Sequence, residues 1–461
     1  MDVGRSIGTA RVVEFSFSGD PVDRVLSSID PADEVFVVER WDPKSRRPDV
    51  SYVGFANKIE KVEKSSTRDT KLDEFDMLRK ILDSKRIEAQ SDTAGLSGGV
   101  FAFYSYESLT EASNEGTGPR AMLMQPMYML VFDHKKSKAY AVIVDVPQTS
   151  EQGADEIVER LKSMCLSQST CQEKGGLEEP VWTPTVTEAE FGEFAATAIE
   201  RMNHESELDG VVLSVQCKTN TDIPPFPSYR WLRRINPSTY MFLATSTGFS
   251  VWGATSLTLA RLKGHRLTVE TDGATRPIEK TADGSPSVWI PNAKEVDEYD
   301  VVLNALVDDL TPIVVAGSLH FTAELEQRRF FDLLHLFAEA EAEVKQDVGP
   351  VDVMRALSPH GAAVGFTRKR ALETIREFEP VARGPFSGSM GFFGFDGSLE
   401  SSTVTRSMWK TVDASFVHAG AKVVTASDPA AEYRECILKT KALRDCARLA
   451  LVEGTTSLDK S

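Results

Sequence analysis

The sequence predicts a protein of mixed α and β structure. Apolar runs of strand length occur at residues 35–39, 51–55 and 209–214, whereas apolar residues recur at helical spacing in 72–84 and in 430–449. The chain has 461 residues, of which 41% are hydrophobic and 26% are charged, a composition typical of globular proteins with a large core. Length alone is compatible with two or three domains or with one elaborate unit.

The N-terminal part, residues 1–165, is expected to form an α/β subdomain. A glycine-led strand is predicted at 98–107, and a hairpin is predicted from 127–132 and 138–145. The next stretch is rich in Ser, Gln, Gly and Pro, so we predict a linker over residues 166–186. A second domain is expected over residues 187–455, and its first helix begins with a capping box of Thr187 and Glu190.

Composition and charge exclude several classes of function. The net charge of −17 argues against nucleic acid as a partner. No apolar run reaches membrane-spanning length, and the first residues carry no apolar segment of signal-peptide type. The five cysteines are odd in number and lack zinc-ligand spacing, so reduced thiols in a cytoplasmic protein are expected.

The C-terminal helix is predicted to begin at the turn 427–429. Pro429 suits the first helical turn, because its missing N–H would have no partner inside the helix there. Glu432 and Glu435 are three residues apart and therefore share one face of this helix. Lys439 lies four residues beyond Glu435 and extends the same face.

A second predicted helix, starting at about residue 294, repeats this spacing with Glu295 and Glu298. Two helices that each offer a pair of carboxylates suit a hard cation such as Mg²⁺, which prefers oxygen ligands. In an acidic chain, however, the spacing alone fits solvated helix faces better than a metal site.

Longer motifs add to these observations. Residues 383–397 read RGPFSGSMGFFGFDG, residues 229–237 read YRWLRRINP, and residues 370–380 read RALETIREFEP. From about residue 210 to residue 441 the chain resembles the chorismate-utilising enzymes, and most closely those of the anthranilate synthase component I type. The resemblance implies an α+β fold in which two antiparallel β-sheets pack as a sandwich with flanking helices. It also implies that Glu295, Glu298, Glu432 and Glu435 bind Mg²⁺.

The resemblance further implies the positions that contact the substrate. Arg406 matches the family's arginine for the substrate carboxylate, which a guanidinium can hold through two parallel hydrogen bonds. His335 and Lys439 fall at catalytic positions, although a lone histidine among leucines is also typical of a buried core residue. The remaining substrate-binding positions implied in this way are Thr275, Arg368, Gly420, Ala421 and Lys422.

Two positions depart from the family pattern. Gly210 stands where the family has a lysine or glutamine, and Leu257 stands where it has a glutamate that acts as general acid. Neither side chain can transfer a proton.

These departures leave three hypotheses for the function. The first is an enzyme that aminates chorismate with ammonia from a separate glutamine amidotransferase subunit. The second is an enzyme with altered chemistry, which acts on a chorismate-like substrate or performs only pyruvate elimination. The third is a non-catalytic chorismate-binding subunit. A small anionic substrate is expected in each case, and assembly as a homodimer is left open.

Overall fold

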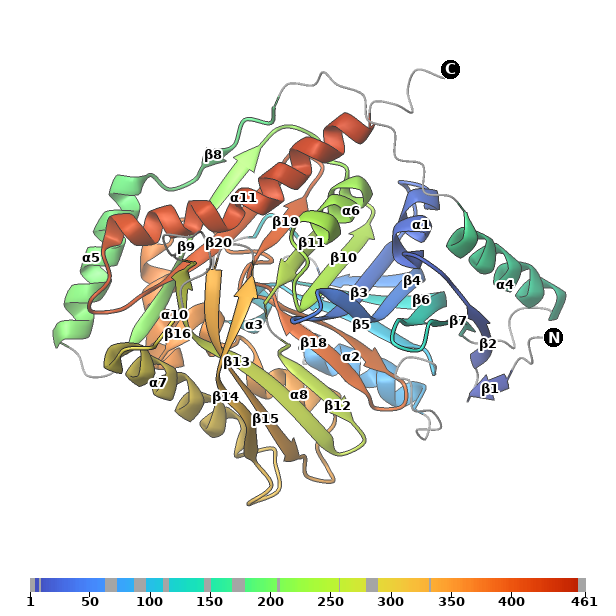
Figure 1. The fold of residues 1–461 in the computed structure, drawn as a ribbon, viewed down its shortest axis with the longest axis horizontal. Coiled ribbons are helices and arrows are strands. Elements are labelled where there is room, and N and C mark those ends of the chain that lie inside the picture. The colour runs from blue at the N-terminus through green and yellow to red at the C-terminus, as the bar shows by residue number, and fades with distance from the viewer. Residues whose placement is uncertain are drawn as a thin grey trace.

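Every strand pairing among the described residues is antiparallel. This computed structural model describes residues 5–7, 10–62, 73–86, 97–110, 116–144, 151–167, 179–204, 208–256, 258–278, 289–330 and 333–454. The pairings connect the strands into one large curled sheet, and helices flank it (Figure 1). The α+β fold with antiparallel sheets and flanking helices, predicted from the sequence, is therefore confirmed.

Helices and strands alternate irregularly along the described chain. The first part of the chain contains β1 (Arg5–Ile7), β2 (Ala10–Ser16), α1 (Pro21–Ser28), β3 (Val35–Asp42), β4 (Arg47–Val62), α2 (Glu74–Ser84), β5 (Gly99–Tyr104), α3 (Tyr106–Leu109), β6 (Ala121–Asp133), β7 (Lys138–Ile143) and α4 (Glu151–Leu166). The middle part contains β8 (Thr183–Pro184), α5 (Glu188–His204), β9 (Gly210–Thr219), α6 (Pro225–Ile235), β10 (Tyr240–Ser246), β11 (Phe249–Thr255), β12 (Ala260–Lys263), β13 (Arg266–Pro277) and α7 (Ala293–Leu310). The last part contains β14 (His320–Phe330), β15 (Leu333–Glu343), α8 (Pro350–Leu357), α9 (Gly361–Val364), β16 (Gly365–Phe366), α10 (Arg368–Phe378), β17 (Ser389–Gly394), β18 (Leu399–Thr403), β19 (Ser407–Lys410), β20 (Ser415–Val423) and α11 (Pro429–Gly454).

Local sequence signals account for several element boundaries. Pro429 is the first residue of α11, as predicted. The capping box at the start of α5 is present, because Thr187 N–H donates to Glu190 Oε2 at 2.8 Å and Glu190 N–H donates to Thr187 Oγ1 at 3.3 Å. The predicted hairpin is formed by β6 and β7.

Central strands such as β3 are buried on both faces. Phe36 and Val38 of β3 contribute to one apolar core, whereas Val35 and Val37 of the same strand contribute to the other. Helices α2 and α8 pack into the first core, and α1, α6 and α11 pack into the second (Figure 1). The first core consists mostly of strand side chains, among them those of β3–β6, β10–β13 and β17, so one face of the curled sheet packs largely against itself, whereas the second core packs against helices.

Strand pairing crosses the boundary that the sequence predicts between an N-terminal subdomain and a second domain. β3 pairs with β10, and β5 pairs with β17. The division into 1–165, 166–186 and 187–455 stays a prediction, and residues 168–178 of the expected linker lie outside the described part. Among the described helices, none combines the length and apolarity needed to cross a bilayer.

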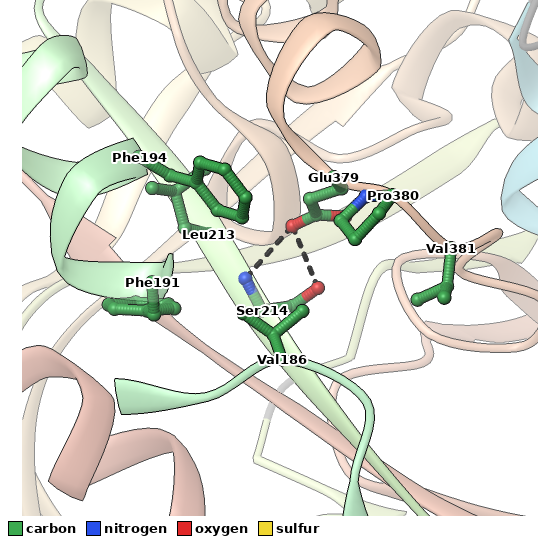
Figure 2. A pocket seen from close by; sticks show the side chains of 8 residues that line it. All are labelled: Val186, Phe191, Phe194, Leu213, Ser214, Glu379, Pro380 and Val381. Carbon is green, nitrogen blue, oxygen red and sulfur yellow. Dashed lines mark hydrogen bonds between the residues drawn. The ribbon is translucent and has the colours of Figure 1, made fainter. Parts of the chain in front are cut away.

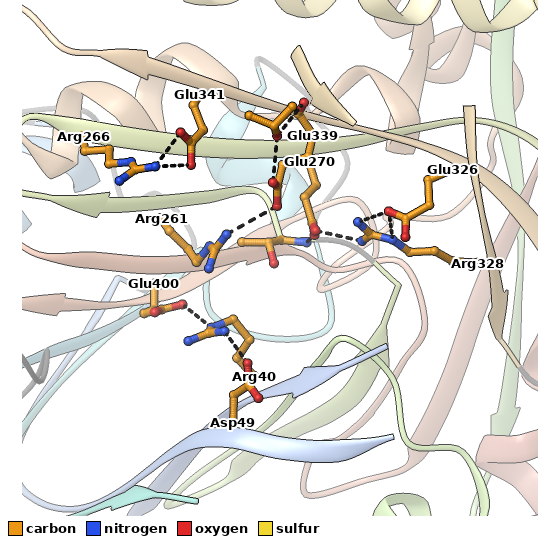
Figure 3. A network of polar contacts seen from close by, with 12 residues as sticks. Arg40, Asp49, Arg261, Arg266, Glu270, Glu326, Arg328, Glu339, Glu341 and Glu400 are labelled. Atoms are coloured by element: carbon orange, nitrogen blue, oxygen red, sulfur yellow. Dashed lines mark hydrogen bonds and ion pairs between the residues drawn. The ribbon is translucent and has the colours of Figure 1, made fainter. Parts of the chain in front are cut away.

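Two arginines near the β13–β15 edge carry very different ion pairs (Figure 3). The Arg328 side chain is 8% exposed, binds Glu270 at 2.7 Å and Glu326 at 2.9 Å, and lies over the Phe337 ring at 4.6 Å. The Arg266 side chain is 72% exposed and binds Glu341 at 2.7 Å. The first pair is buried and the second is a surface pair.

We expect Arg328→Ala to lower the free energy of unfolding by about 3–5 kcal/mol, because it leaves the buried Glu270 carboxylate without its cation. The matched control Arg266→Ala should change it by no more than about 1 kcal/mol, since Arg266 is an exposed partner and water can take its place beside Glu341. Urea denaturation of both variants measures the difference. Equal effects would contradict the assignment of Arg328 as a buried structural cation.

Candidate functional site

His335 of β15 lies between a carboxylate and a guanidinium. Its Nδ1 is 3.2 Å from Asp272 Oδ2 of β13, and its Nε2 is 3.4 Å from Arg406 Nη2, in the segment between β18 and β19. His335 is 3% exposed and Arg406 is 7% exposed. Side chains from three separate segments therefore meet in a water-poor environment.

A bulge in β13 brings Asp272 to this place. Asp272 pairs with Phe337 and Thr275 pairs with His335, so the register shifts between Asp272 and Thr275. Such a bulge bends the strand and redirects a side chain. Gly273, within the bulge, has no room for a Cβ, which would lie 2.7 Å from Tyr299 Cδ2 and 2.9 Å from Tyr299 Cα of α7. The glycine thus lets α7 pack directly against the bulge.

Arg406 depends on a second close backbone approach. A Cβ at Gly253 of β11 would lie 2.4 Å from Arg406 O, and Ala254 N–H donates to the same carbonyl at 3.2 Å. Only glycine at 253 allows this contact, because real Cβ atoms do not approach a carbonyl oxygen so closely. The backbone of Arg406 is thereby fixed to β11.

Two lysines connect β20 and α11 to this group. Lys439 binds Glu435 at 2.7 Å, one helical turn away, and donates to Gly420 O at 2.9 Å. Lys422 donates to Gly273 O inside the bulge. Gly420 itself has no space for a side chain, since a Cβ would lie 2.7 Å from the Phe386 ring. Cations from two further elements therefore lie beside the Asp272–His335–Arg406 group.

Burial and neighbouring charges set the protonation states. Burial lowers the pKa of His335, and Arg406 and Lys439 lower it further, whereas Asp272 opposes them. Burial also lowers the pKa of Arg406, although Asp272 and Glu435 partly offset this. For Glu435, burial favours the neutral acid, but Lys439, His335 and Arg406 together hold its pKa below the ordinary value. The histidine is therefore neutral and the carboxylate ionised near neutral pH.

The other residues expected in the site fall into three groups. The Ala421 side chain packs in the apolar core, so only its backbone is available to a ligand. Arg368 binds Asp309 of α7 and Ala356 O, and none of its described contacts is with Arg406 or His335. The side chains of Thr275 and Glu298, and the whole of Leu257, lie outside the described part.

The carboxylates at the expected metal positions differ in the groups that they already bind. Glu295 Oε2 accepts from Asn292 N–H at 2.8 Å and from Trp289 Nε1 at 3.1 Å, so this carboxylate caps its own helix. Glu432 and Glu435 lie one turn apart near the start of α11, half-buried. Among the described side chains, no three metal-binding groups are already gathered. Carboxylate oxygens nevertheless match Mg²⁺, which often takes only one or two from the protein.

A small pocket between α5, β9 and the segment after α10 has a structural role (Figure 2). Ser214 donates to Glu379 Oε1 through its backbone N–H at 2.9 Å and through its hydroxyl at 2.8 Å. Arg383 binds the same carboxylate at 2.7 Å. His418 Nε2 lies 2.9 Å from Ser214 Oγ. Because the acid faces the serine rather than the histidine, this is not a nucleophile-activating triad.

Comparison with known proteins places this chain in a family. A model described as chorismate binding enzyme matches residues 34–445, so the chain belongs to the chorismate binding enzyme family. Anthranilate synthase component 1 of Cereibacter sphaeroides is 25% identical over 390 residues, which cover 81% of this chain and 78% of the relative. Aminodeoxychorismate synthase component 1 of Bacillus subtilis is 26% identical over 376 residues, which cover 79% of this chain and 80% of the relative.

Solved structures agree on the fold. Anthranilate synthase component I from Streptococcus pneumoniae aligns with a TM-score of 0.73 at 21% identity and covers 90% of this chain and 93% of its own. The menaquinone-specific isochorismate synthase from Escherichia coli aligns with a TM-score of 0.73 at 17% identity and covers 97% and 96%. The names of these relatives span three different reactions, so the family assignment alone does not select one.

Sequence analysis missed Asp272 and His360. Asp272 lies just before the Thr275 position, and its contact with His335 was not predicted from the sequence. His360 is the N-cap of α9, where Nδ1 accepts from Ala362 N–H at 3.3 Å. Burial and the nearby Arg368 guanidinium lower the pKa of His360 to about 4, while Asp272 acts in the opposite direction.

His360 should make the protein sensitive to acid. Its stabilising contribution is present above the ordinary pKa of 6.5 and is lost as the pH falls toward about 4, because the unfolded chain binds the proton first. Between about pH 7.5 and about pH 4.5, wild type should lose roughly 2–3 kcal/mol more unfolding free energy than His360→Gln. Urea denaturation measures this. The exposed control His320→Gln should show the same pH dependence of the unfolding free energy as wild type. If His360→Gln also shows this dependence, His360 is not the source of the acid sensitivity.

Proposed function

We propose that this chain is a Mg²⁺-dependent enzyme that converts chorismate, or a closely related small anionic ring compound, by amination, by elimination of pyruvate, or by both. The observation that carries the proposal is the buried Arg406 guanidinium beside His335, in a chain of the chorismate binding enzyme family. Ammonia would come from a separate glutamine amidotransferase subunit.

Arg406 suits the recognition of a substrate carboxylate. Its guanidinium is 7% exposed and can form two parallel charge-assisted hydrogen bonds with such a group. In a water-poor site these bonds are stronger than at the surface. The ammonium groups of Lys422 and Lys439 donate hydrogen bonds to Gly273 O and Gly420 O. They add positive charge beside Arg406, although the chain as a whole has a net charge of −17. The substrate would thus be drawn to a local cationic site.

The acidic residues of α7 and α11 would hold the metal. Glu435 and Glu432 would bind Mg²⁺ from α11, and Glu298 and Glu295 from α7. When bound, the ion would neutralise negative charge on the substrate. The chain's own residues orient the ring through Arg406 and exchange a proton through His335.

One observation favours a second candidate function. A Cβ at Gly210 would lie 3.3 Å from Val424 Cγ1 and 3.9 Å from Lys422 Cγ, and no acid–base group exists at that position. A site that holds the substrate and lacks this group would bind chorismate without aminating it. The alternative is therefore a different reaction on the same substrate class, or a non-catalytic chorismate-binding subunit.

Mass spectrometry of products separates these functions. Purified protein is incubated with Mg²⁺ and chorismate, with and without ammonium. An ammonium-dependent aminated product supports amination, a product without added nitrogen supports elimination or rearrangement, and binding without turnover supports the binding subunit. Absence of both binding and turnover would contradict the proposed function.

Arg406→Lys should weaken chorismate binding by about 10- to 100-fold, because an ammonium retains the charge but not the paired hydrogen bonds. Calorimetry or fluorescence titration measures the dissociation constant. The matched control Arg266→Lys changes an exposed arginine and should leave it unaltered. Wild-type affinity in Arg406→Lys would exclude Arg406 as the carboxylate-binding residue.

Glu435→Gln should weaken Mg²⁺ binding in the presence of chorismate by at least about 10-fold, since it removes a carboxylate ligand. Isothermal titration calorimetry with MgCl₂ reports this directly. Glu193→Gln, on the exposed face of α5, serves as control. Equal Mg²⁺ affinity in the wild type and in Glu435→Gln would remove Glu435 from the metal site.

A further inference from the structure

We propose that Asp272 is a positioning residue that holds His335 as the Nδ1–H tautomer, so that Nε2 presents a lone pair to a substrate bound at Arg406. The inference rests on the proposed function, because it assigns the proton acceptor of the same site. Nothing in the chain's resemblance to its relatives identifies this aspartate; its role follows from the contacts of three side chains.

The two neighbours of His335 determine the position of its proton. A guanidinium has only hydrogen-bond donors, so Arg406 Nη2, at 3.4 Å, requires that Nε2 accept. A carboxylate has only acceptors when ionised, so Asp272 Oδ2, at 3.2 Å, requires that Nδ1 donate. Both demands are met by one neutral tautomer, in which the proton is on Nδ1.

Charge around the ring favours the same state. Arg406 and Lys439 both lower the pKa of His335, in addition to burial, and Asp272 opposes them. His335, His360 and Lys422 lower the pKa of Asp272, although burial acts against them. Asp272 is therefore ionised while the ring is neutral. The pairing of a carboxylate with a neutral imidazole fixes both the tautomer and the ring orientation.

The backbone holds Asp272 in place. It lies at the bulge of β13, directly before Gly273, whose carbonyl accepts from Lys422 and whose Cα packs against Tyr299. Tyr299 is itself anchored, because its hydroxyl donates to Phe337 O at 3.1 Å, two residues after His335. The carboxylate and the ring are thus attached to one rigid part of the β13–β15 pair.

The arrangement suits proton transfer once a substrate is bound. A substrate carboxylate would engage Arg406 and free Nε2 from the guanidinium. A proton on the bound ring compound can then pass to Nε2: its bond to the substrate atom breaks, the electron pair remains on the substrate, and an N–H bond forms. Asp272 stabilises the resulting imidazolium, and the proton later returns to product or to water.

The tautomer is directly measurable by NMR. The full chain is labelled with ¹⁵N-histidine, and loss of one ring signal in His335→Gln assigns His335. We expect the wild type near neutral pH to show a protonated Nδ1 and an unprotonated Nε2, and we expect Asp272→Asn to shift the ring toward a mixture of tautomers. A protonated Nε2 in the wild type, or an unchanged ring in Asp272→Asn, would overturn the inference.

Kinetics provide a second readout. With a substrate that the wild type converts, Asp272→Asn should lower kcat by about 100-fold or more while KM changes little, and Asp272→Glu should restore part of the rate. The control Asp413→Asn, in the exposed turn between β19 and β20, should retain wild-type kcat. A loss confined to KM would overturn the inference. Failure of the wild type to convert chorismate would refute the proposed enzymatic function, whereas the NMR experiment would still decide the role of Asp272.

Discussion

The burial of the Arg406 guanidinium is the constraint around which the candidate site is arranged. A charge removed from water needs compensating partners, and its pKa is lowered despite the nearby Asp272 and Glu435. The bulge of β13, the close approach at Gly253 and the docking of α11 all bring groups to this cation or hold it in position. An anionic ligand would supply negative charge that Asp272 and Glu435 provide only in part.

Local signals in the sequence predicted the parts of the fold that depend on local chemistry. The start of α11 at Pro429 and the capping box of Thr187 and Glu190 follow from neighbouring residues, and the structure confirms both. The pairing of Glu435 with Lys439 likewise follows from helical spacing. The Asp272–His335 contact was not predictable in this way, because it joins residues 63 positions apart and depends on a one-residue register shift.

Helical spacing alone did not predict the capping role of Glu295. The residue lies on α7 as expected, yet its carboxylate accepts from Asn292 N–H and Trp289 Nε1. Asn292 three residues earlier was the signal for a cap, since asparagine followed by glutamate satisfies two unpaired amides at a helix start. Both of these hydrogen bonds use Oε2, so a metal at Glu295 would have to bind Oε1 or replace the cap. Glu435 lies one turn further into its helix and binds Lys439 instead.

The pairing of β5 with β17 has a consequence for the folding of this chain during its translation. Residues 99–104 acquire one of their two neighbouring strands only from residues 389–394, so that edge of β5 stays open while most of the remaining chain is translated. At ordinary ribosome speeds this interval is roughly 15–60 s. During that time an apolar strand with unsatisfied amides is available to other nascent chains.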